Sequence, residues 1–275
     1  MKLNPKYTRG GEKSIQQFES ALKSRQKQHP IKSASKTSSQ AAKELNEAGY
    51  CILKDTISKA TVNKLRKDMD SLLRDRKNLK SRDAYFAAVQ DPLTKSRHCI
   101  DLAVSGILID IGTAFFECKP AIGTTNLRKS YIHNLPTKDT QLYHSDKNSV
   151  RFIKFFFYLR DVDMDSGPFV YVKGSHNEKF KNWESKYRWT NKEIENIYGK
   201  QNIKCLTASA GDVLVANPTG FHKGLKPKTK NRMMYTVNYV IHPEDWRKPK
   251  ELISQKYYKT IPKEKKFIAD FLIKT

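Results

Sequence analysis

The sequence contains no run of 18 or more apolar residues, so it predicts no transmembrane helix. Its longest apolar candidate, Leu102 to Phe116, is interrupted by Asp110, and we expect a helix of a soluble protein there. Residues 1–13 lack the apolar segment of a secretory signal, and the four cysteines form no CxxC pair. We therefore expect a cytoplasmic protein with reduced, mostly buried thiols at Cys51, Cys99, Cys118 and Cys205.

Acidic residues are also scarce, because 28 Asp and Glu stand against 52 Lys and Arg, a formal net charge of +24. The excess is concentrated at the two ends, with +7 in residues 1–36 and +6 in residues 247–275. Basic ends can bind nucleic acid or an anionic membrane, although a lysine-rich composition also simply keeps a protein in solution. Lys outnumbers Arg 39 to 13, whereas base recognition relies on bidentate Arg. Nucleic-acid binding is therefore less favoured than an anionic small-molecule substrate.

The order of helical and strand patterns predicts one mainly β domain with flanking α-helices. Residues 1–38 are polar and basic, and we expect a flexible or loosely helical arm. Residues 39–275 form the single domain, with a β core at about 120–245 and a helical insertion near 178–202. The expected helices are 41–48, one capped by Ser58, and about 101–118. The clearest expected strands are 49–53, 151–160, 167–172, 212–216 and 233–241.

A possible metal site begins at Tyr143-His144-Ser145-Asp146. Residues i and i+2 of a strand point to the same face, so His144 and Asp146 can reach one metal ion. His222 is the candidate for the third ligand. Two imidazoles and one carboxylate on one face of an octahedron make the facial triad of non-haem Fe(II) oxygenases. The HxD pattern alone is a weak signal, since a surface pair arises often by chance.

Arg232 strengthens this interpretation, because it lies ten residues after His222 across a turn centred on Pro227-Lys228-Thr229. If residues 213–222 and 232–241 form a hairpin, His222 and Arg232 are cross-strand neighbours with Cβ atoms ~5–8 Å apart. That span suits 2-oxoglutarate, whose C1 carboxylate and C2 ketone would chelate iron while a guanidinium binds the C5 carboxylate.

The sequence resembles the phytanoyl-CoA dioxygenase family in two specific blocks. One is HSDKNSVRFIKFFFYLRDVDMDSGPFVYVKGSH, residues 144–176, and the other is SAGDVLVANPTGFHKG followed by Arg232. Weaker similarity extends over about residues 40–245. The resemblance implies a double-stranded β-helix (jelly-roll, cupin-like) core that uses Fe(II), 2-oxoglutarate and O2. It also implies hydroxylation of a small organic substrate, with an anion among the candidates, and release of succinate and CO2.

The resemblance assigns metal binding and catalysis to His144, Asp146 and His222, and 2-oxoglutarate binding to Arg232. Related halogenases have a small residue at the position of Asp146, so a carboxylate there favours oxygenation. Family members often have a hydroxyl residue two positions after the distal histidine, where this chain has Gly224. The second anchor of 2-oxoglutarate therefore stays open, with Thr219, Asn126 and Tyr131 as candidates that can equally be ordinary strand residues. His176 is better explained by a turn at a strand end than by metal binding.

The substrate is not determined by the sequence, and neither is the oligomeric state. Several cations flank the predicted site in sequence and are candidates to meet an anion, although charges beside a strand are usually solvated: Arg128, Lys129, Lys147, Arg151 and Lys154. The sequence leaves two alternatives open. One is a jelly-roll binding or scaffold protein without catalysis, and the other is a basic oxygenase associated with nucleic acid.

Overall fold

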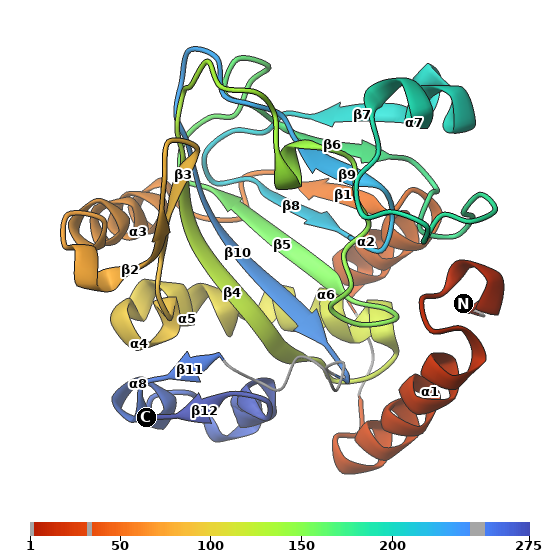
Figure 1. Cartoon of the computed structure of the whole chain (residues 1–275). Coiled ribbons are helices and arrows are strands. Elements are labelled where there is room, and N and C mark those ends of the chain that lie inside the picture. The colour runs from red at the N-terminus through yellow and green to blue at the C-terminus, as the bar shows by residue number, and fades with distance from the viewer. Residues whose placement is uncertain (1–2, 32–34, 243–250) are drawn as a thin grey trace.

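A computed structural model of the chain describes residues 3–31, 35–242 and 251–275. Two antiparallel sheets form its centre (Figure 1). The large sheet has the strand order β1 (Tyr50–Leu53), β8 (Val213–Ala216), β5 (Ile153–Tyr158), β10 (Arg232–Val240), β4 (Ala121–Ser130), β3 (Phe86–Val89) and β2 (Leu79–Arg82). The small sheet has the order β7 (Ile203–Leu206), β6 (Phe169–Val172) and β9 (His222–Gly224).

The two faces of the large sheet contact different neighbours, because side chains alternate along each strand. On β5, Ile153, Phe155 and Phe157 join the main apolar core with the helices. The intervening Phe156 and Tyr158 pack instead with Phe169 and Tyr171 of the small sheet. The aromatic-rich strand expected at 151–160 is therefore buried on both faces, as the sequence predicted.

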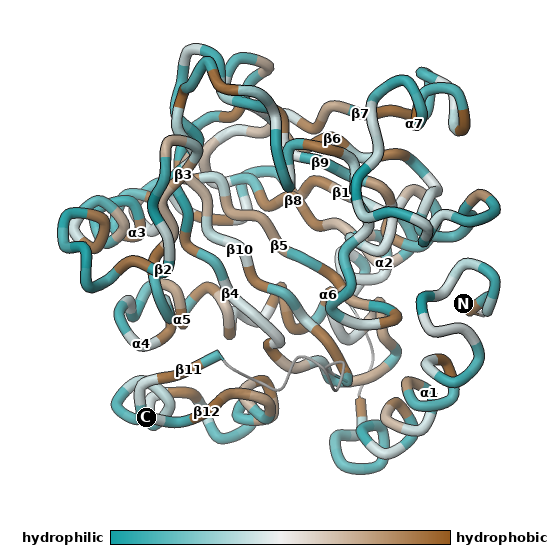
Figure 2. Tube along the Cα trace, in the orientation of Figure 1, coloured by the Kyte–Doolittle hydropathy of each residue, from teal (hydrophilic) through white to brown (hydrophobic). Residues whose placement is uncertain are grey.

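Helices cover the face of the large sheet that is turned away from the small sheet (Figure 1). They are α2 (Lys36–Glu47), α3 (Lys59–Leu72), α4 (Pro92–Lys95), α5 (Arg97–Ala103) and α6 (Gly106–Phe116). Tyr235 of β10 donates a hydrogen bond to the carbonyl of Cys99 at 3.0 Å, which joins the sheet to α5. Apolar residues gather on the strands and on the helices behind them, whereas the outer loops are hydrophilic (Figure 2).

The helix expected at 101–118 is two helices, α5 and α6, which meet at Val104–Ser105. Ser105 has an extended backbone and precedes the first residue of α6, a position that serine favours. Of the helices described, none is by itself both long and apolar enough to cross a bilayer, although α5 and α6, bent by 40°, would together have the length and composition. The cysteines are free thiols, with Cys205 exposed and the other three buried.

The basic N-terminal region contains an ordered helix, α1 (Gly11–Gln28), where the sequence suggested a flexible or loosely helical arm. Phe18 is buried in the main core. The Arg25 guanidinium pairs with Asp270 at 3.0 Å and donates to the carbonyl of Phe267 at 2.9 Å. The burial of Phe18 and the polar contacts of Arg25 therefore hold in place a segment whose composition is mainly polar. The division of the chain at residue 38 stays a prediction.

The C-terminal segment packs beside the start of β4 (Figure 1). Its elements are β11 (Leu252–Ile253), α8 (Gln255–Lys259), a 3-10 turn (Lys263–Ala269) and β12 (Ile273–Lys274). The helical insertion expected near 178–202 contains turns, α7 (Asn191–Tyr198) and a short 3-10 turn (Lys200–Asn202). Residues 247–250 of the basic C-terminal region lie outside the described residues.

Gly167, just before β6, should tolerate no side chain. Its φ is +73°, and a Cβ there would lie 2.3 Å from the carbonyl oxygen of Leu225. We expect Gly167→Ala to lower the free energy of unfolding by more than the roughly 1–2 kcal/mol that the left-handed conformation costs. Gly174→Ala is the matched control, since its φ is +78° with nothing within 4 Å of the added Cβ. Equal urea midpoints for the two variants would show that the backbone contact is unimportant.

Candidate metal centre and inner cavity

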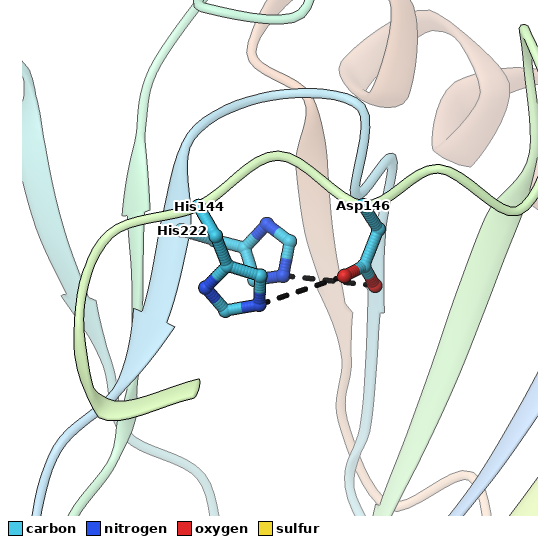
Figure 3. A group of neighbouring side chains, drawn as sticks. All are labelled: His144, Asp146 and His222. Carbon is cyan, nitrogen blue, oxygen red and sulfur yellow. Dashed lines mark ion pairs between the residues drawn. The ribbon is translucent and has the colours of Figure 1, made fainter. Parts of the chain in front are cut away.

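His144 and Asp146 lie in an extended segment that joins the edge of the small sheet. The backbone N–H of His144 donates to the carbonyl of His222 at 3.0 Å, and the reverse bond measures 2.9 Å. Asp146 N–H donates to the carbonyl of Pro218 at 2.9 Å. These bonds bring together residues almost 80 positions apart and turn the three side chains toward one point (Figure 3). The predicted HxD geometry is therefore produced by a backbone bridge to β9.

The three side chains have the spacing of a metal centre. The Nε2 atom of His144 lies 3.5 Å from Oδ1 of Asp146, and Nε2 of His222 lies 3.8 Å from Oδ2. One ligand atom from each of the three residues falls within 4.8 Å of the others. Among the residues that the structure describes, this is the one group of three or more His, Cys, Asp or Glu side chains with such spacing.

Hydrogen bonds orient both imidazoles for metal binding. The Nδ1 atom of His144 lies 2.9 Å from the carbonyl oxygen of Leu142, and Nδ1 of His222 lies 2.9 Å from that of Gly220. A carbonyl oxygen can only accept, so each Nδ1 carries the proton and each Nε2 has its lone pair free toward Asp146. Backbone carbonyls of this kind commonly fix the tautomer of a metal-binding histidine.

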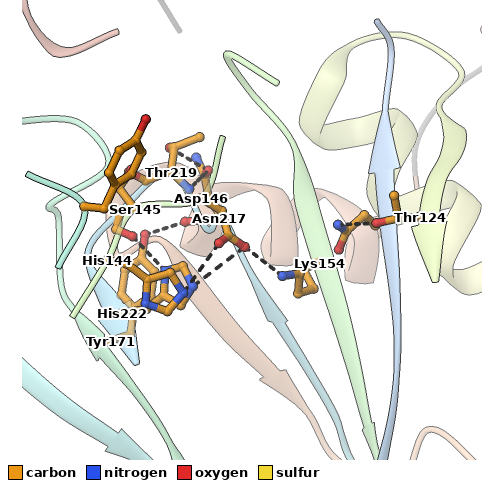
Figure 4. A network of polar contacts seen from close by, with 12 residues as sticks. Thr124, His144, Ser145, Asp146, Lys154, Tyr171, Asn217, Thr219 and His222 are labelled. Atoms are coloured by element: carbon orange, nitrogen blue, oxygen red, sulfur yellow. Dashed lines mark hydrogen bonds and ion pairs between the residues drawn. The ribbon is translucent and has the colours of Figure 1, made fainter. Parts of the chain in front are cut away.

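The protonation states of the three residues also suit metal binding. Burial lowers the pKa of His144, and burial together with the nearby His144 lowers that of His222 to about 3. Burial alone would raise the pKa of Asp146, but the Lys154 ammonium and the two imidazoles more than offset this and hold it below its usual range. Lys154 Nζ lies 2.8 Å from Oδ2 (Figure 4). Neutral imidazoles and an ionised carboxylate are the forms that bind a metal.

The metal centre opens into a cavity of about 180 Å³ between the two sheets, which we call the inner cavity. Its walls come from the inward-facing positions of β4, β5 and β10 and from β6 and β9, because every second residue of a strand faces this side. Besides the three metal-site residues, its lining includes Asn126, Arg128, Lys154, Phe156, Phe169 and Arg232.

Arg232 lines the inner cavity, but the predicted hairpin between residues 213–222 and 232–241 was wrong. β9 pairs with β6 in the small sheet, whereas β10 pairs with β4 and β5 in the large sheet. His222 and Arg232 therefore face each other between the sheets. Gly224 lies two residues after His222 on β9, and a Cβ on it would lie 3.1 Å from Nη2 of Arg232. Between β9 and β10 the chain passes from the small sheet to the large sheet. The inner faces of the two sheets are buried against each other.

Two guanidinium groups meet at this end of the cavity without a carboxylate partner. Arg232 is 8% exposed, and its contacts are long ones, at 3.4 Å to the carbonyl of Leu225 and 3.5 Å to Oγ of Ser130. Arg128 lies over the ring of Phe86 at 3.6 Å, and burial and the Arg232 charge lower its pKa to about 10. Neither residue forms an ion pair in the described part of the chain, and the Nε atom of each lacks a hydrogen-bond partner. The pair is suited to bind an anion.

The other sequence candidates divide between the inner cavity and its surroundings. Asn126 lines the inner cavity with an Oδ1 that lacks a partner. Thr219 lies outside it and donates to Oδ1 of Asn217 at 2.8 Å, while its carbonyl accepts from Ser145 Oγ at 2.7 Å (Figure 4). Tyr131 packs against the main apolar core just after the end of β4 and does not line the inner cavity.

The cations that flank the site in sequence also separate. Arg128 and Lys154 enter the inner cavity, and Lys147 and Arg151 line a second pocket beyond Asp146. Lys129 points away, with Nζ 3.8 Å from Asp70. Lys179, for which the sequence predicted no role, also lines the second pocket. Its only sequence signal was a lysine three residues after the GSH turn.

His176 is a structural residue, as the sequence suggested. It is buried, and its Nε2 lies 3.1 Å from the carbonyl oxygen of Asn46, which leaves it out of the metal group. Burial lowers its pKa to about 4.

The stability of the metal-free protein should therefore fall as the pH decreases from about 6.5 to about 4. In this window the unfolded state takes up the proton that the buried imidazole of His176 resists, which costs roughly 3 kcal/mol in all. Urea unfolding at pH 7 and pH 5 tests this against His176→Asn. The variant should show a smaller loss, because His144 and His222 contribute equally in both proteins; identical losses would contradict the assignment.

The family follows from a sequence comparison. The model of the phytanoyl-CoA dioxygenase (PhyH) family matches residues 45–234, more than half of the chain. The chain belongs to the phytanoyl-CoA dioxygenase family. The match includes all three metal-site residues and Arg232. No curated protein sequence matches this family member.

Solved structures of similar fold agree with the family. The epimerase SnoN, in complex with Fe3+, alpha ketoglutarate and nogalamycin RO, has a TM-score of 0.60 at 14% identity over 74% of this chain and 83% of SnoN. The carbocyclase SnoK from nogalamycin biosynthesis has a TM-score of 0.57 at 17% identity over 74% and 83%. HygX from Streptomyces hygroscopicus, with nickel, 2-oxoglutarate and hygromycin B bound, has a TM-score of 0.54 at 17% identity over 73% and 86%. These similarities establish the jelly-roll fold that the sequence predicted.

Proposed function

We propose that this family member is an Fe(II)- and 2-oxoglutarate-dependent dioxygenase that hydroxylates a small organic substrate and releases succinate and CO2. The observation that carries the proposal is the presence, in one cavity, of the His144–Asp146–His222 group and the unpaired guanidinium of Arg232. SnoN and HygX, which share the fold, have been solved with a metal and 2-oxoglutarate bound.

The residues of the cavity fit both groups. His144, Asp146 and His222 would hold Fe(II), because two neutral imidazoles and a carboxylate are the ligands of the facial triad. Arg232 would bind the C5 carboxylate of 2-oxoglutarate in a charge-assisted pair. Arg128, from the neighbouring strand β4, is our candidate for the second anchor that Gly224 cannot supply. Asn126 is a further candidate through its amide, whereas Thr219 and Tyr131 do not line the cavity.

When bound, iron, 2-oxoglutarate and dioxygen would supply oxidation of a substrate C–H bond coupled to decarboxylation of the co-substrate. The protein orients and shields these groups. Phe156 and Phe169 give the cavity apolar walls, and Lys154 keeps Asp146 ionised and in place. Asp146 also occupies the position that a halide would need, which favours hydroxylation over halogenation. SnoN and SnoK are described as an epimerase and a carbocyclase, so product analysis has to test the hydroxylation step.

Anaerobic reconstitution tests the metal and co-substrate part of the proposal. Fe(II) and 2-oxoglutarate together should produce a weak visible absorption band that neither gives alone. Air should then yield succinate, and a substrate panel under 18O-labelled dioxygen should yield a product that contains the label if the reaction is hydroxylation. A protein that binds neither Fe(II) nor 2-oxoglutarate would instead be the non-catalytic scaffold.

A further inference from the structure

A second pocket, larger than the inner cavity, also has Asp146 in its lining. Its volume is about 330 Å³, and we call it the outer pocket. Asp146 lines both spaces, so they meet at the metal centre. The residues of the outer pocket that matter here are Arg9, Lys147, Arg151, Lys179 and Trp183. They come from the N-terminal segment, the segment between Asp146 and β5, and the connection from β6 to β7.

The outer pocket is strongly cationic. Four of its lining residues carry a positive charge and one carries a negative charge, and that one is Asp146, which the metal centre uses. The walls of the outer pocket therefore carry more positive than negative charge, and Glu184, outside these walls, pairs with Arg9. The inner cavity also has an excess of positive charge, at Arg128 and Arg232, so the two spaces have the same sign of charge.

Two of these cations are buried against oxygen atoms that carry no formal charge. Lys179 is 4% exposed, and its Nζ donates to the carbonyls of Thr219 at 2.7 Å and Ser175 at 3.2 Å. Arg151 is 8% exposed and donates to the carbonyl of Phe115 at 2.6 Å and to Oδ1 of Asn46 at 3.0 Å. Neither forms an ion pair with a carboxylate of the residues that the structure describes. Arg151 Nε is buried without a partner.

Buried cations with this environment are costly unless an anion completes it. A buried charge that lacks a counter-charge is destabilising, and carbonyl dipoles offset only part of the lost hydration. Burial lowers the pKa of Lys179 to about 7, with a smaller lowering by Arg9 and an opposing effect of Glu184, so the nearby carboxylate does not offset the cost of burial. Cations at functional sites often have this combination of burial and a perturbed pKa.

The N-terminal segment forms one wall of the outer pocket. Arg9 pairs with Glu184 at 3.3 Å and lies over the ring of Trp183 at 5.0 Å. These contacts attach the segment to the connection between β6 and β7, and Figure 1 shows the N-terminus beside that connection. A segment that looked in sequence like a basic tail therefore lines the same pocket as Asp146 and Lys179, with the charge of Arg9 paired to Glu184.

We propose that the outer pocket binds the oxyanion group of the substrate, a carboxylate, phosphate or sulfate on a small organic molecule, beside Lys147, Arg151 and Lys179. This inference rests on the proposed function and adds the substrate class. The anion would be held in the outer pocket while 2-oxoglutarate fills the inner cavity, and the substrate carbon next to Asp146 would be the one presented for oxidation.

Anion binding can be measured without turnover, in the metal-free full-length protein. Inorganic phosphate, sulfate and acetate are titrated separately, and the fluorescence of Trp183 reports occupancy of the outer pocket. At least one should bind, and the preferred one distinguishes a phosphorylated, sulfated or carboxylated substrate. Lys147→Gln should weaken it about tenfold, the effect of one charged hydrogen bond. Lys204→Gln, a half-buried lysine on β7 outside the pocket, is the matched control and should change nothing.

Two further variants separate the outer pocket from the inner cavity. Lys179→Met should weaken the same anion at least as much as Lys147→Gln, and Lys147→Gln serves alone if Lys179→Met does not fold. Arg232→Gln should leave anion binding unchanged but weaken 2-oxoglutarate. The fluorescence change should disappear in Trp183→Phe.

The inference is overturned if none of the three anions binds, or if Arg232→Gln abolishes binding while Lys147→Gln does not. Either result leaves the visible band with Fe(II) and 2-oxoglutarate intact. Loss of that band in the unmodified protein would overturn the proposed function and leave anion binding to be judged by the titrations alone.

Discussion

Asp146→Ala should abolish succinate formation. Among the described residues, the substitution removes the one carboxylate within reach of both Nε2 atoms, at 3.5 and 3.8 Å, and leaves two neutral imidazoles to hold the metal. Loss of a group that only supports a metal ligand costs about 10–100-fold in affinity or activity, so loss of a ligand should cost at least about 100-fold. The measurement is succinate formed per enzyme, with Fe(II) affinity determined anaerobically on the same samples.

Two controls separate metal binding from folding in this experiment. Asp165→Ala removes an exposed carboxylate from a loop and should retain full activity. Asp146→Glu keeps a carboxylate and should retain part of the metal binding. Because Asp146→Ala also leaves Lys154 without its partner at 2.8 Å, the unfolding midpoint of the variant has to be recorded. Unchanged succinate yield in a folded Asp146→Ala protein would contradict the metal centre.

Arg232→Gln should raise the KM for 2-oxoglutarate by at least about 30-fold. Truncating one partner of a buried, hydrogen-bonded charge pair costs about 2–5 kcal/mol, and each 1.4 kcal/mol is a factor of ten. Without 2-oxoglutarate the same change should not destabilise the protein, because Arg232 is a buried cation with no ion-pair partner in the described residues. Thermal unfolding with and without 2-oxoglutarate measures both effects.

Arg128→Gln tests whether the neighbouring guanidinium is the second anchor. We expect a smaller rise in the KM for 2-oxoglutarate than for Arg232→Gln, since Arg128 also stacks on Phe86 at 3.6 Å. Arg160→Gln removes an exposed cation beyond the end of β5 and is the matched control. If Arg128→Gln and Arg160→Gln behave alike, Arg128 has no part in the site and Asn126 becomes the next candidate.

The metal centre could be predicted from sequence because two of its residues, His144 and Asp146, lie two positions apart in the chain. An HxD pair in an extended segment places both side chains on one side whatever sheet it joins. The aromatic-rich run of residues 151–160 likewise predicts a strand that is mostly buried on both faces, which the structure confirms. The capping position of Ser58 before α3 is a third local feature, and its side chain accepts the N–H of Thr61 as expected.

The environment of Arg232 could not be predicted in the same way. Its ten-residue spacing from His222 suggested a hairpin, yet β9 and β10 belong to different sheets. Spacing in the chain constrains which residues can meet, but strand pairing is decided by which arrangement buries the most apolar surface on both sheets. The same applies to α1, where Phe18 is buried in the main core and Arg25 pairs with Asp270 from 245 positions away.

The sequence by itself therefore determined the family, the jelly-roll class and the three residues of the metal centre. The tertiary structure alone decided that Arg128 stands beside Arg232, that Thr219 and Tyr131 lie outside the inner cavity, and that Lys179 and Arg9 join the outer pocket. The physical reason is that periodicity along a strand fixes which side chains share a face. The residues that meet across a cavity are set by the packing of segments far apart in the chain.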